Sequence, residues 1–358
     1  MIDVVKLTNF RNFKSRTLNF SKRVTVISGP NASGKTNILE SIFLISTGRS
    51  FKAKVEEEMI NYDSDVARVS GRLIKPLSTR LEVVLTRGFL DVGNDHPEKV
   101  ARKKLTLDGV SRRLIDFVGN FKVVLFGPWD MDLVGGPPTL RRKFLDTVLS
   151  QVDREYRRSI LSYEKGLKQR NRLLLKIREE GYPRNYLMFW NQLLIKNGDY
   201  INAARRKFIE FANEEDKLQI PGFKFQIDYD QSVISEGRLE QYKEEEVAAA
   251  TTLVGPHRDD FIFKIKDMGK DKKERDMASF GSRGEQRMGV LWIKMAELAF
   301  IEEVTYEKPT LLLDDIFSEL DEIRRKIVIE IAKKQQTIIT TAEIGSLPSI
   351  GEVEIIEL

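Results

Sequence analysis

The sequence predicts an α/β protein with a parallel core, an accompanying mixed sheet and an inserted helical-hairpin lobe. Three observations support this prediction. A short apolar strand at 23–28 runs through a glycine-rich loop into a helix at 37–45. A second apolar strand at 310–313 ends in two aspartates, as a central parallel strand beside a ligand site would. Between them, apolar residues from 145 to 211 recur at the spacing of amphipathic helices.

The glycine-rich loop reads Gly-Pro-Asn-Ala-Ser-Gly-Lys-Thr and matches the phosphate-binding pattern G-x-x-x-x-G-K-T. Its glycines allow backbone angles that turn N–H groups toward a phosphate, and the following helix adds partial positive charge. We expect Lys35 to reach the β- and γ-phosphates and the Thr36 hydroxyl to hold Mg²⁺. The predicted cofactors are therefore ATP and Mg²⁺. The predicted nucleotide contacts are Gly29, Pro30, Asn31, Ala32, Ser33, Gly34, Lys35 and Thr36.

Composition narrows the chemistry that this chain can carry. Its 358 residues include no cysteine, which excludes disulfides, thiol catalysis and cysteine-bound zinc. His96 and His257 are the only histidines, so a histidine-rich metal site is excluded. No apolar run approaches the roughly 20 residues of a membrane span, and the N-terminus lacks the order of a signal peptide. We expect a cytoplasmic protein without a membrane partner.

Further elements follow from period-2 alternation, helical spacing and turn residues. The dipeptide Asp108-Gly109 between two short polar-apolar runs predicts a hairpin turn. The remaining expected elements are strands at 67–73, 80–85, 223–229, 260–265 and 337–341, a charged turn or loop at 270–275, and a helix at 317–334.

The apolar stripes between residues 145 and 211 break at Gly181-Tyr182-Pro183, which predicts two long helices packed as an antiparallel hairpin. A first helix of about 38 residues would reach on the order of 57 Å, so we expect it to bend or break. The predicted domains are residues 1–138 with the phosphate loop, an inserted helical lobe at 139–221, and residues 222–358.

The first helix of this lobe is strongly basic. Between Arg141 and Arg178 there are twelve Lys and Arg but only four Asp and Glu, an excess larger than the +5 net charge of the whole chain. Such a face is a candidate contact for a DNA backbone, although an ordinary solvated helix face would look the same. The candidate DNA-binding residues here are Arg141, Arg142, Arg157 and Arg158.

The strand at 310–313 supplies the second half of a nucleotide site. Asp314 emerges at its carboxyl end and is expected to hold Mg²⁺, while Asp315 is placed to orient or deprotonate the attacking water. Lys35 and Asp314 are 279 residues apart, so a large insertion must separate the two halves of the site.

The segment Ser282-Arg283-Gly284-Glu285 begins a helix 32 residues before Asp314. A hydroxyl and free N–H groups at a helix start can bind an anion, although the same pattern also makes a helix cap. The order of phosphate loop, this segment and the double aspartate is typical of ABC-type ATPases. In that class the segment, called the signature, covers the γ-phosphate bound by a second subunit. We therefore expect an ATP-dependent homodimer in which Ser282 and Gly284 act across the interface.

With these motifs placed, the chain resembles bacterial RecF, the recombination-repair ATPases related to SMC proteins. The resemblance runs in order from residue 5 to about 342. It rests on five blocks besides the phosphate loop: 7–13, 47–51, 126–137, 255–260 and 311–321. Pro30 and Ser33 stand where the family often carries Glu and Gln, and Trp129 replaces a commonly acidic residue.

The resemblance implies an ABC-type ATPase head that dimerises on ATP and hydrolyses it slowly, as a weak DNA-stimulated ATPase. The expected role is recombinational gap repair and replication restart, as part of the DNA-damage (SOS) response. It includes binding to single- and double-stranded DNA or their junctions at gaps, and loading of RecA with RecR and RecO as partners. By analogy Arg11 and Asn12 lie near the nucleotide and Arg49 senses nucleotide or DNA. Thr340 or Thr341 stands where ABC transporters carry a switch histidine.

Two alternatives come from other classes. An ABC-type ATPase subunit of a different assembly, for transport or coupled to a nuclease, would share the motifs. A transport subunit would normally carry the switch histidine, and its inserted lobe should be less basic. A small-molecule kinase would share the phosphate loop, but it needs an acceptor pocket and no signature segment.

Overall fold

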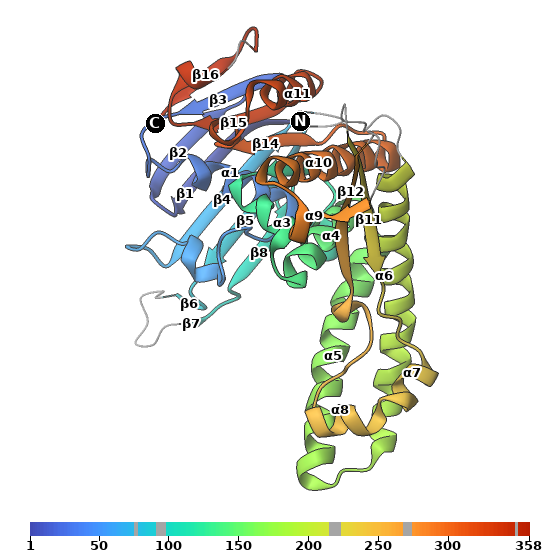
Figure 1. Cartoon of the computed structure of the whole chain (residues 1–358). Helices are drawn as coiled ribbons and strands as arrows, with labels where there is room; N and C mark the ends of the chain where they lie inside the picture. The colour runs from blue at the N-terminus through green and yellow to red at the C-terminus, as the bar shows by residue number, and fades with distance from the viewer. Residues whose placement is uncertain (75–77, 91–97, 215–222, 268–273, 348–349) are drawn as a thin grey trace. The chain divides into compact units, whose positions relative to one another are not determined.

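The structure is a computed structural model that describes residues 1–74, 78–90, 98–214, 223–267, 274–347 and 350–358 (Figure 1). The chain divides into two units. Unit 1 combines Met1–Asp130 with Ile301–Leu358, and unit 2 is Met131–Phe300. These units cut the chain near residues 130 and 300, whereas the sequence led us to expect boundaries near 138 and 221. The boundaries of the inserted lobe stay a prediction.

The centre of unit 1 is a five-stranded sheet in which all neighbours are parallel, in the order β10-β14-β15-β3-β16. Every residue of β3, β10, β14 and β15 is buried, as expected for apolar runs in a parallel sheet. The edge strand β16 was not predicted, because its Glu-Ile-Ile-Glu sequence is short and largely exposed. The strands are β3 (Val24–Ser28), β10 (Val123–Phe126), β14 (Thr310–Asp314), β15 (Thr337–Thr341) and β16 (Glu354–Glu357).

A second sheet of unit 1 is antiparallel, in the order β2-β1-β4-β5-β8-β9. The hairpin turn predicted at Asp108-Gly109 joins β8 to β9, and both turn residues have positive φ, 49° and 80°. The strands are β1 (Ile2–Phe10), β2 (Phe13–Asn19), β4 (Val66–Leu73), β5 (Thr79–Thr86), β8 (Lys103–Leu107) and β9 (Val110–Arg112); β6 (Phe89–Leu90) pairs with β7 (Glu98–Lys99) in a separate ribbon.

The helix after the phosphate loop, α1 (Lys35–Thr47), contacts strands of both sheets. Its residues 38–46 are all buried, because both sides of the helix face a sheet. The helix predicted at 317–334 starts later than expected, so the predicted start is wrong. A 3₁₀ turn, η6 (Ile316–Glu319), comes first, and Asp321 then caps α11 (Glu322–Ala332) by accepting a hydrogen bond from Arg324 N–H. The remaining short helices are η1 (Glu56–Met59), α2 (Leu114–Phe117), η2 (Pro128–Met131) and η7 (Ile344–Ser346).

Unit 2 contains the predicted helical hairpin. Its long first helix breaks as expected, at Asp153, whose carboxylate accepts hydrogen bonds from two N–H groups and caps the second piece. The pieces are α4 (Pro138–Val152) and α5 (Arg154–Glu180), and α5 packs along α6 (Met188–Glu214) (Figure 1). Short helices lie before α4 and after α5, namely α3 (Asp132–Gly135) and η3 (Arg184–Leu187).

The rest of unit 2 is a three-stranded antiparallel sheet in the order β11-β12-β13, with short helices around it. Of the charged loop predicted at 270–275, residues 270–273 lie outside the described residues and 274–275 begin β13. Across the described ranges, no helix is long and apolar enough to span a membrane. The elements are β11 (Phe223–Asp230), α7 (Glu236–Gln241), α8 (Lys243–Ala249), η5 (Pro256–Arg258), β12 (Asp260–Asp267), β13 (Glu274–Asp276), α9 (Met277–Phe280) and α10 (Arg283–Thr305), whose residues from Ile301 onward are counted with unit 1.

Candidate functional site

The phosphate loop joins the carboxyl end of β3 to the first turn of α1, as its sequence predicted. Gly34 precedes α1 with φ of +105°, and a Cβ there would lie 2.6 Å from Asn12 Nδ2. Glycine is therefore required at this position by both backbone conformation and space. The first N–H groups of α1 have no partner within the helix, so they remain available to an anion.

Lys35 is held over its own loop. Its Nζ donates hydrogen bonds to the carbonyl oxygens of Gly29, at 2.7 Å, and Pro30, at 2.9 Å. These bonds keep the ammonium beside the loop backbone, where an anion cradled by the loop would meet it.

Asp314 connects three elements of unit 1. The Thr36 hydroxyl lies 2.8 Å from Asp314 Oδ2, and the Thr340 hydroxyl lies 2.5 Å from Oδ1. Asp314 and Thr340 are partners in the register of β14 and β15, while Thr36 lies in the first turn of α1. The parallel order β14-β15-β3 thus brings together residues that lie almost 280 positions apart in the sequence.

Asp315 has a left-handed backbone with φ of 49°. Its N–H donates to Thr340, reaching the backbone oxygen at 3.2 Å and the hydroxyl at 3.1 Å. A non-glycine residue in this conformation is uncommon, and such residues gather at functional sites. Of the two candidate switch threonines, Thr340 contacts both aspartates, whereas the Thr341 hydroxyl donates to the Glu343 carbonyl.

The residues after β1 support the loop from one side. Asn12 Nδ2 donates to the Ser33 carbonyl at 3.0 Å, so its contact is with the loop backbone. Arg11 forms a two-point ion pair with the fully buried Glu40 of α1, at 2.6 and 2.8 Å. Arg49 is exposed just after α1. The structure therefore gives Arg11 a role in positioning α1 and places Asn12 against the loop.

The loop residues fit a bound phosphate, and one buried atom supports that fit directly. The Ser33 hydroxyl oxygen is buried and has no hydrogen-bond partner among the described residues. Unsatisfied buried polar atoms are rare in folded proteins and indicate a missing partner. The Thr36 hydroxyl and Asp314 carboxylate are oxygen donors of the kind that Mg²⁺ prefers.

Comparisons with known proteins agree with this geometry. The family model described as RecF/RecN/SMC N terminal domain matches residues 1–349. The DNA replication and repair protein RecF of Clostridium acetobutylicum is 35% identical over 358 aligned positions, covering 95% of this chain and 92% of that protein. This chain belongs to the RecF family. Its fold is the ABC-type ATPase head that RecF shares with SMC proteins, as the sequence predicted.

Two solved RecF structures superpose on nearly the whole chain. One is described as the recombination mediator protein RecF-ATPrS in the RecFOR pathway. It is 30% identical, with a TM-score of 0.86, and the match covers 99% of this chain and 96% of that one. The other, described as RecF-ATP in the same pathway, is 31% identical, with a TM-score of 0.83 and coverage of 97% and 93%.

The RecF signature segment lies in unit 2 at the start of α10. Ser282 N–H donates to Glu285 Oε2 at 2.7 Å, and Glu285 N–H donates to the Ser282 hydroxyl at 3.2 Å. This reciprocal pair is a capping box. Arg275 also donates to Glu285, and despite partial burial these bonds lower the pKa of the Glu285 carboxyl. Ser282 remains exposed and Gly284 is partly buried, so the cap leaves the serine side accessible.

The basic face of the helical lobe is less available to DNA than its charge count indicates. Arg141 is buried and forms a two-point ion pair with Asp260, and its Nη1 donates to the carbonyl oxygens of Gly136 and Leu133. Arg142 donates to the Asp259 carbonyl. An arginine held in this way is not presented to a phosphate, so the proposed DNA contact at Arg141 needs correcting to a structural role.

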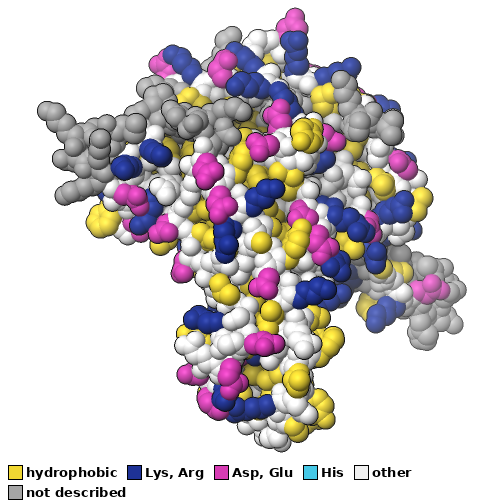
Figure 2. Space-filling model, turned by 90° about the vertical axis from the view of Figure 1, so that its right-hand side faces the viewer, with side chains coloured by type: hydrophobic (Ala, Val, Ile, Leu, Met, Phe, Trp, Pro, Cys, Tyr) yellow, Lys and Arg dark blue, Asp and Glu magenta, His cyan; other side chains and the backbone are white. Residues whose placement is uncertain are grey.

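The other two candidates lie nearer the surface. Arg157 is partly buried and donates to the Ser150 carbonyl, and Arg158 is exposed but paired with Glu155. Arg170, which also contributed to the charge count, is buried against Glu246 at 2.6 Å. Figure 2 shows acidic and basic side chains interspersed on the visible face of the hairpin, at the bottom of the view. The lobe therefore offers fewer free cations than the sequence count implied.

Unit 2 contains a buried polar network that was not predicted from the sequence. The Arg205 side chain, 1% exposed, donates to Asp259, to Asp146 and to the Pro256 carbonyl, each within 2.8 Å. Tyr229 donates its hydroxyl to Asp259 as well, at 2.5 Å. The block 255–260, which contributed to the RecF resemblance, lies at the centre of this network. Its charged residues hold unit 2 together, and removing one partner would leave an uncompensated buried charge.

His257 lies in the same block, 255–260, but bonds to Tyr163 and Thr252, and it is expected to make stability pH-dependent. Its Nε2 donates to the Thr252 carbonyl at 3.0 Å, and its Nδ1 accepts from the Tyr163 hydroxyl at 2.9 Å. Burial lowers the pKa of His257 to about 4, and nearby arginines, Arg258 foremost, add to the lowering. Between pH 6.5 and pH 4, His257 is protonated in the unfolded chain but stays neutral in the folded chain. The free energy of unfolding therefore falls as the pH drops from 6.5 toward 4.

We expect the wild-type protein to lose about 2 kcal/mol more stability than His257→Gln between pH 7 and pH 5. Urea unfolding at the two pH values measures the difference. Other groups titrate in this range in both proteins, so the comparison isolates His257. Equal losses in the two proteins would mean that the histidine is not held neutral in the folded state.

Proposed function

We propose that this chain is an ATP-dependent switch that binds DNA in recombinational gap repair. The observation that carries the proposal is the meeting of Thr36, Asp314 and Thr340 at the carboxyl edge of the parallel sheet. It joins a phosphate loop to a carboxylate pair, which is the arrangement that nucleotide hydrolysis requires. The RecF relatives named for DNA repair, and the solved RecF structures named for ATP, support the same assignment.

ATP would be held by the loop residues from Gly29 to Thr36. The Lys35 ammonium would offset the charge of the β- and γ-phosphates, and the Ser33 hydroxyl would gain the partner that it lacks in the fold. Mg²⁺ would be held by Thr36 and Asp314, and when bound it neutralises charge that develops on the phosphate oxygens. Asn12 keeps the loop in shape through its bond to the Ser33 carbonyl.

Asp315 is the residue proposed to act on water. Its backbone N–H is held by two hydrogen bonds to Thr340. These bonds fix the position from which the Asp315 side chain extends. A carboxylate can orient a water molecule and accept its proton during attack on the γ-phosphate. Thr340 is a weaker acceptor than the histidine of transport ATPases, which supports slow turnover and a switch rather than a motor.

Ser282 and Gly284 are proposed to close on the γ-phosphate of a second copy of the chain. The capping box fixes the start of α10 and keeps Ser282 exposed, so its hydroxyl and the first N–H groups of the helix can face an anion. ATP would then stabilise a homodimer, and hydrolysis would open it. Gap junctions with single- and double-stranded DNA, RecR and RecO as partners, and support for RecA loading belong to this proposal.

An ABC-type ATPase subunit of a transport or nuclease assembly remains the second candidate, because such subunits share the fold. The extended RecF match, covering 95% of this chain at 35% identity, favours the repair function. Binding of gapped DNA in the presence of ATP, measured by fluorescence anisotropy, tests the choice. A chain that binds ATP but not DNA would be a subunit of the transport type.

Replacing Asp315 by asparagine should trap the switch in its ATP-bound form. Asparagine has the same size and tolerates left-handed backbone, so the turn should survive while the proton acceptor is lost. We expect turnover to fall at least 100-fold, with ATP binding retained and a longer-lived dimer. Phosphate release and sedimentation in ATP measure the two effects.

The matched control is Glu322→Gln, the same change on an exposed carboxylate at the start of α11. It should hydrolyse ATP at the wild-type rate. Normal turnover in Asp315→Asn would assign the water-orienting role to another group.

A further inference from the structure

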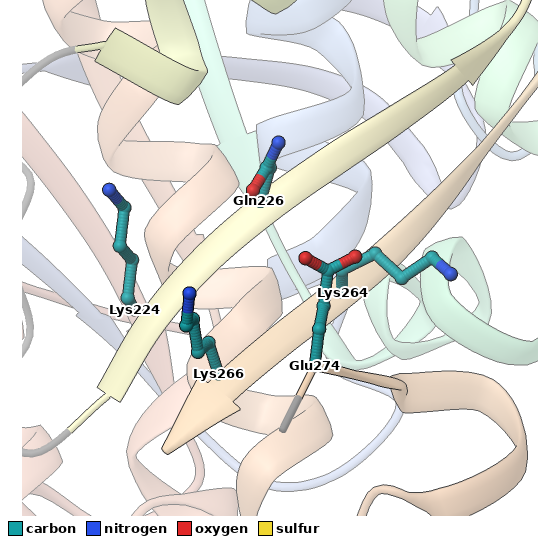
Figure 3. Close-up of a pocket in the computed structure, with 5 residues that line it drawn as sticks. All are labelled: Lys224, Gln226, Lys264, Lys266 and Glu274. Atoms are coloured by element: carbon teal, nitrogen blue, oxygen red, sulfur yellow. The ribbon is translucent and has the colours of Figure 1, made fainter. Parts of the chain in front are cut away.

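One surface of unit 2 carries cations that the proposed ATP site does not use. Lys224, Lys264 and Lys266 line a shallow depression of about 50 Å³ on the sheet β11-β12-β13, together with Gln226 and Glu274 (Figure 3). We call the three lysines the lysine face. Lys224 and Lys266 are exposed and Lys264 is partly buried.

The fold forces these lysines onto one side of the sheet. Lys224 stands opposite Lys266 in the antiparallel register, and Gln226 stands opposite Lys264. Residues two apart on a strand share a face, so all four lie on one face of the sheet. In Figure 3 the side chains of Lys224, Gln226 and Lys266 point in similar directions, while that of Lys264 extends to the side. The alternate residues are apolar and buried on the other face: Phe225, Ile227, Phe263 and Ile265. A one-residue register shift would expose them, so the lysines are fixed on the solvent-facing side.

The arrangement is unfavourable without an anion. Like charges directly opposite each other on neighbouring strands destabilise a sheet. On the β13 side Lys266 stands opposite Glu274 and Lys264 opposite Asp276. The Asp276 carboxylate already accepts hydrogen bonds from two N–H groups at the start of α9, whereas Lys224 and Lys266 face each other directly. No ion pair joins the lysine face to any residue within the described part of the chain. A lysine on an edge strand can prevent aggregation, which would explain Lys224, but β12 is central and this reason does not apply to Lys264 or Lys266.

We propose that the lysine face binds the phosphate backbone of DNA. Lys264 and Lys266 are spaced about 7 Å along the strand, and Lys224 lies about 5 Å across from Lys266, so the charges spread over more than one phosphate group. The depression is too small to enclose a drug-sized ligand, for which pockets of roughly 300 Å³ or more are usual. An open, flat cationic surface suits an extended polyanion better than a free anion.

This inference rests on the proposed DNA binding and locates it on the sheet rather than on the helical lobe. The test compares Lys224→Gln/Lys266→Gln with Lys165→Gln/Lys168→Gln, which removes the same charge from exposed positions of α5. Binding of a labelled gapped duplex in ATP is measured by anisotropy between about 50 and 200 mM salt. Wild-type failure to bind this DNA would reject the proposed function and the lysine face with it.

With wild-type binding established, the lysine-face variant should bind about tenfold more weakly, and its slope of log affinity against log salt should fall by about two. The α5 variant should behave like wild type, and Lys224→Arg/Lys266→Arg should retain binding. Equal affinity and slope in wild type and the lysine-face variant would overturn the inference while leaving the proposed function intact. Titration with inorganic phosphate tests whether the lysine face binds free phosphate instead of the phosphate groups of DNA. Saturable phosphate binding that the glutamine variant loses without any change in DNA affinity would also overturn it.

Discussion

Lys35→Arg is expected to abolish ATP-dependent dimerisation. Lys35 Nζ fits within 2.9 Å of two carbonyl oxygens of its own loop, a space suited to a compact point charge. The guanidinium of arginine is a wider planar fork and cannot take the same position without moving the loop. We expect ATP affinity to fall at least 100-fold, about 3 kcal/mol, and the protein to remain monomeric in ATP. Sedimentation velocity with and without ATP measures the result.

Lys54→Arg is the matched control for this variant. Lys54 is exposed in the same unit, and its charge is preserved by the substitution. It should dimerise in ATP like wild type. If Lys35→Arg showed the same dimer fraction in ATP as this control, the phosphate loop would not be needed for ATP-dependent dimerisation.

Ser282→Arg should give the opposite combination: ATP binding retained, with dimerisation and turnover lost. Ser282 is exposed at the start of α10, so an arginine there changes the surface without entering the core. Its bulk and length would occupy the space proposed for the partner's γ-phosphate. Turnover should fall at least 100-fold, while nucleotide affinity of the monomer stays within a factor of about two. Fluorescent nucleotide binding, sedimentation and phosphate release measure the three quantities.

A second substitution separates this blocking effect from loss of the helix cap. Ser282→Ala removes the hydroxyl that accepts from Glu285 N–H, at a cost of about 1 kcal/mol in stability. It adds no bulk, so it should dimerise better than Ser282→Arg. Comparable defects in both variants would mean that loss of the Ser282 hydroxyl, and not the added bulk of arginine, accounts for the result.

Mixing the two inactive variants tests whether the signature acts across a dimer. In a mixed dimer, Ser282→Arg contributes an intact phosphate loop and Lys35→Arg contributes an intact signature. The intact loop and the intact signature then form one complete ATP site. The second ATP site of the same dimer contains both substitutions. Turnover should return, up to that of one site per dimer. A mixture as inactive as its components would contradict an interface built from two chains.

The phosphate loop, the double aspartate and the parallel core could be predicted because their signals are local. Each is a run of consecutive residues whose apolar or glycine content directly requires a strand, a turn or a helix. The role of Thr340 was narrowed to two threonines but not decided, because only the register of β14 with β15 shows which one faces Asp314.

The free positive charge of the helical lobe was overestimated because the contacts that neutralise it are not local. The acids that neutralise it lie far away in the sequence: Asp260 is 119 positions from Arg141, and Glu246 is 76 positions from Arg170. A count over one segment cannot include such partners. The network around Arg205 was missed in the same way, since its contacts to Asp146 and Asp259 span 59 and 54 positions.

During synthesis, β3 leaves the ribosome long before either of its neighbours exists. The strands that flank it, β15 and β16, are made about 300 residues later, which takes roughly 15 to 60 s at usual elongation rates. In that interval all of unit 2 is translated, while an apolar strand waits unpaired in a nascent chain. Such a strand is a natural client for chaperones. ATP can therefore stabilise only a chain that has been translated through its last strands, and offers no help to one still emerging.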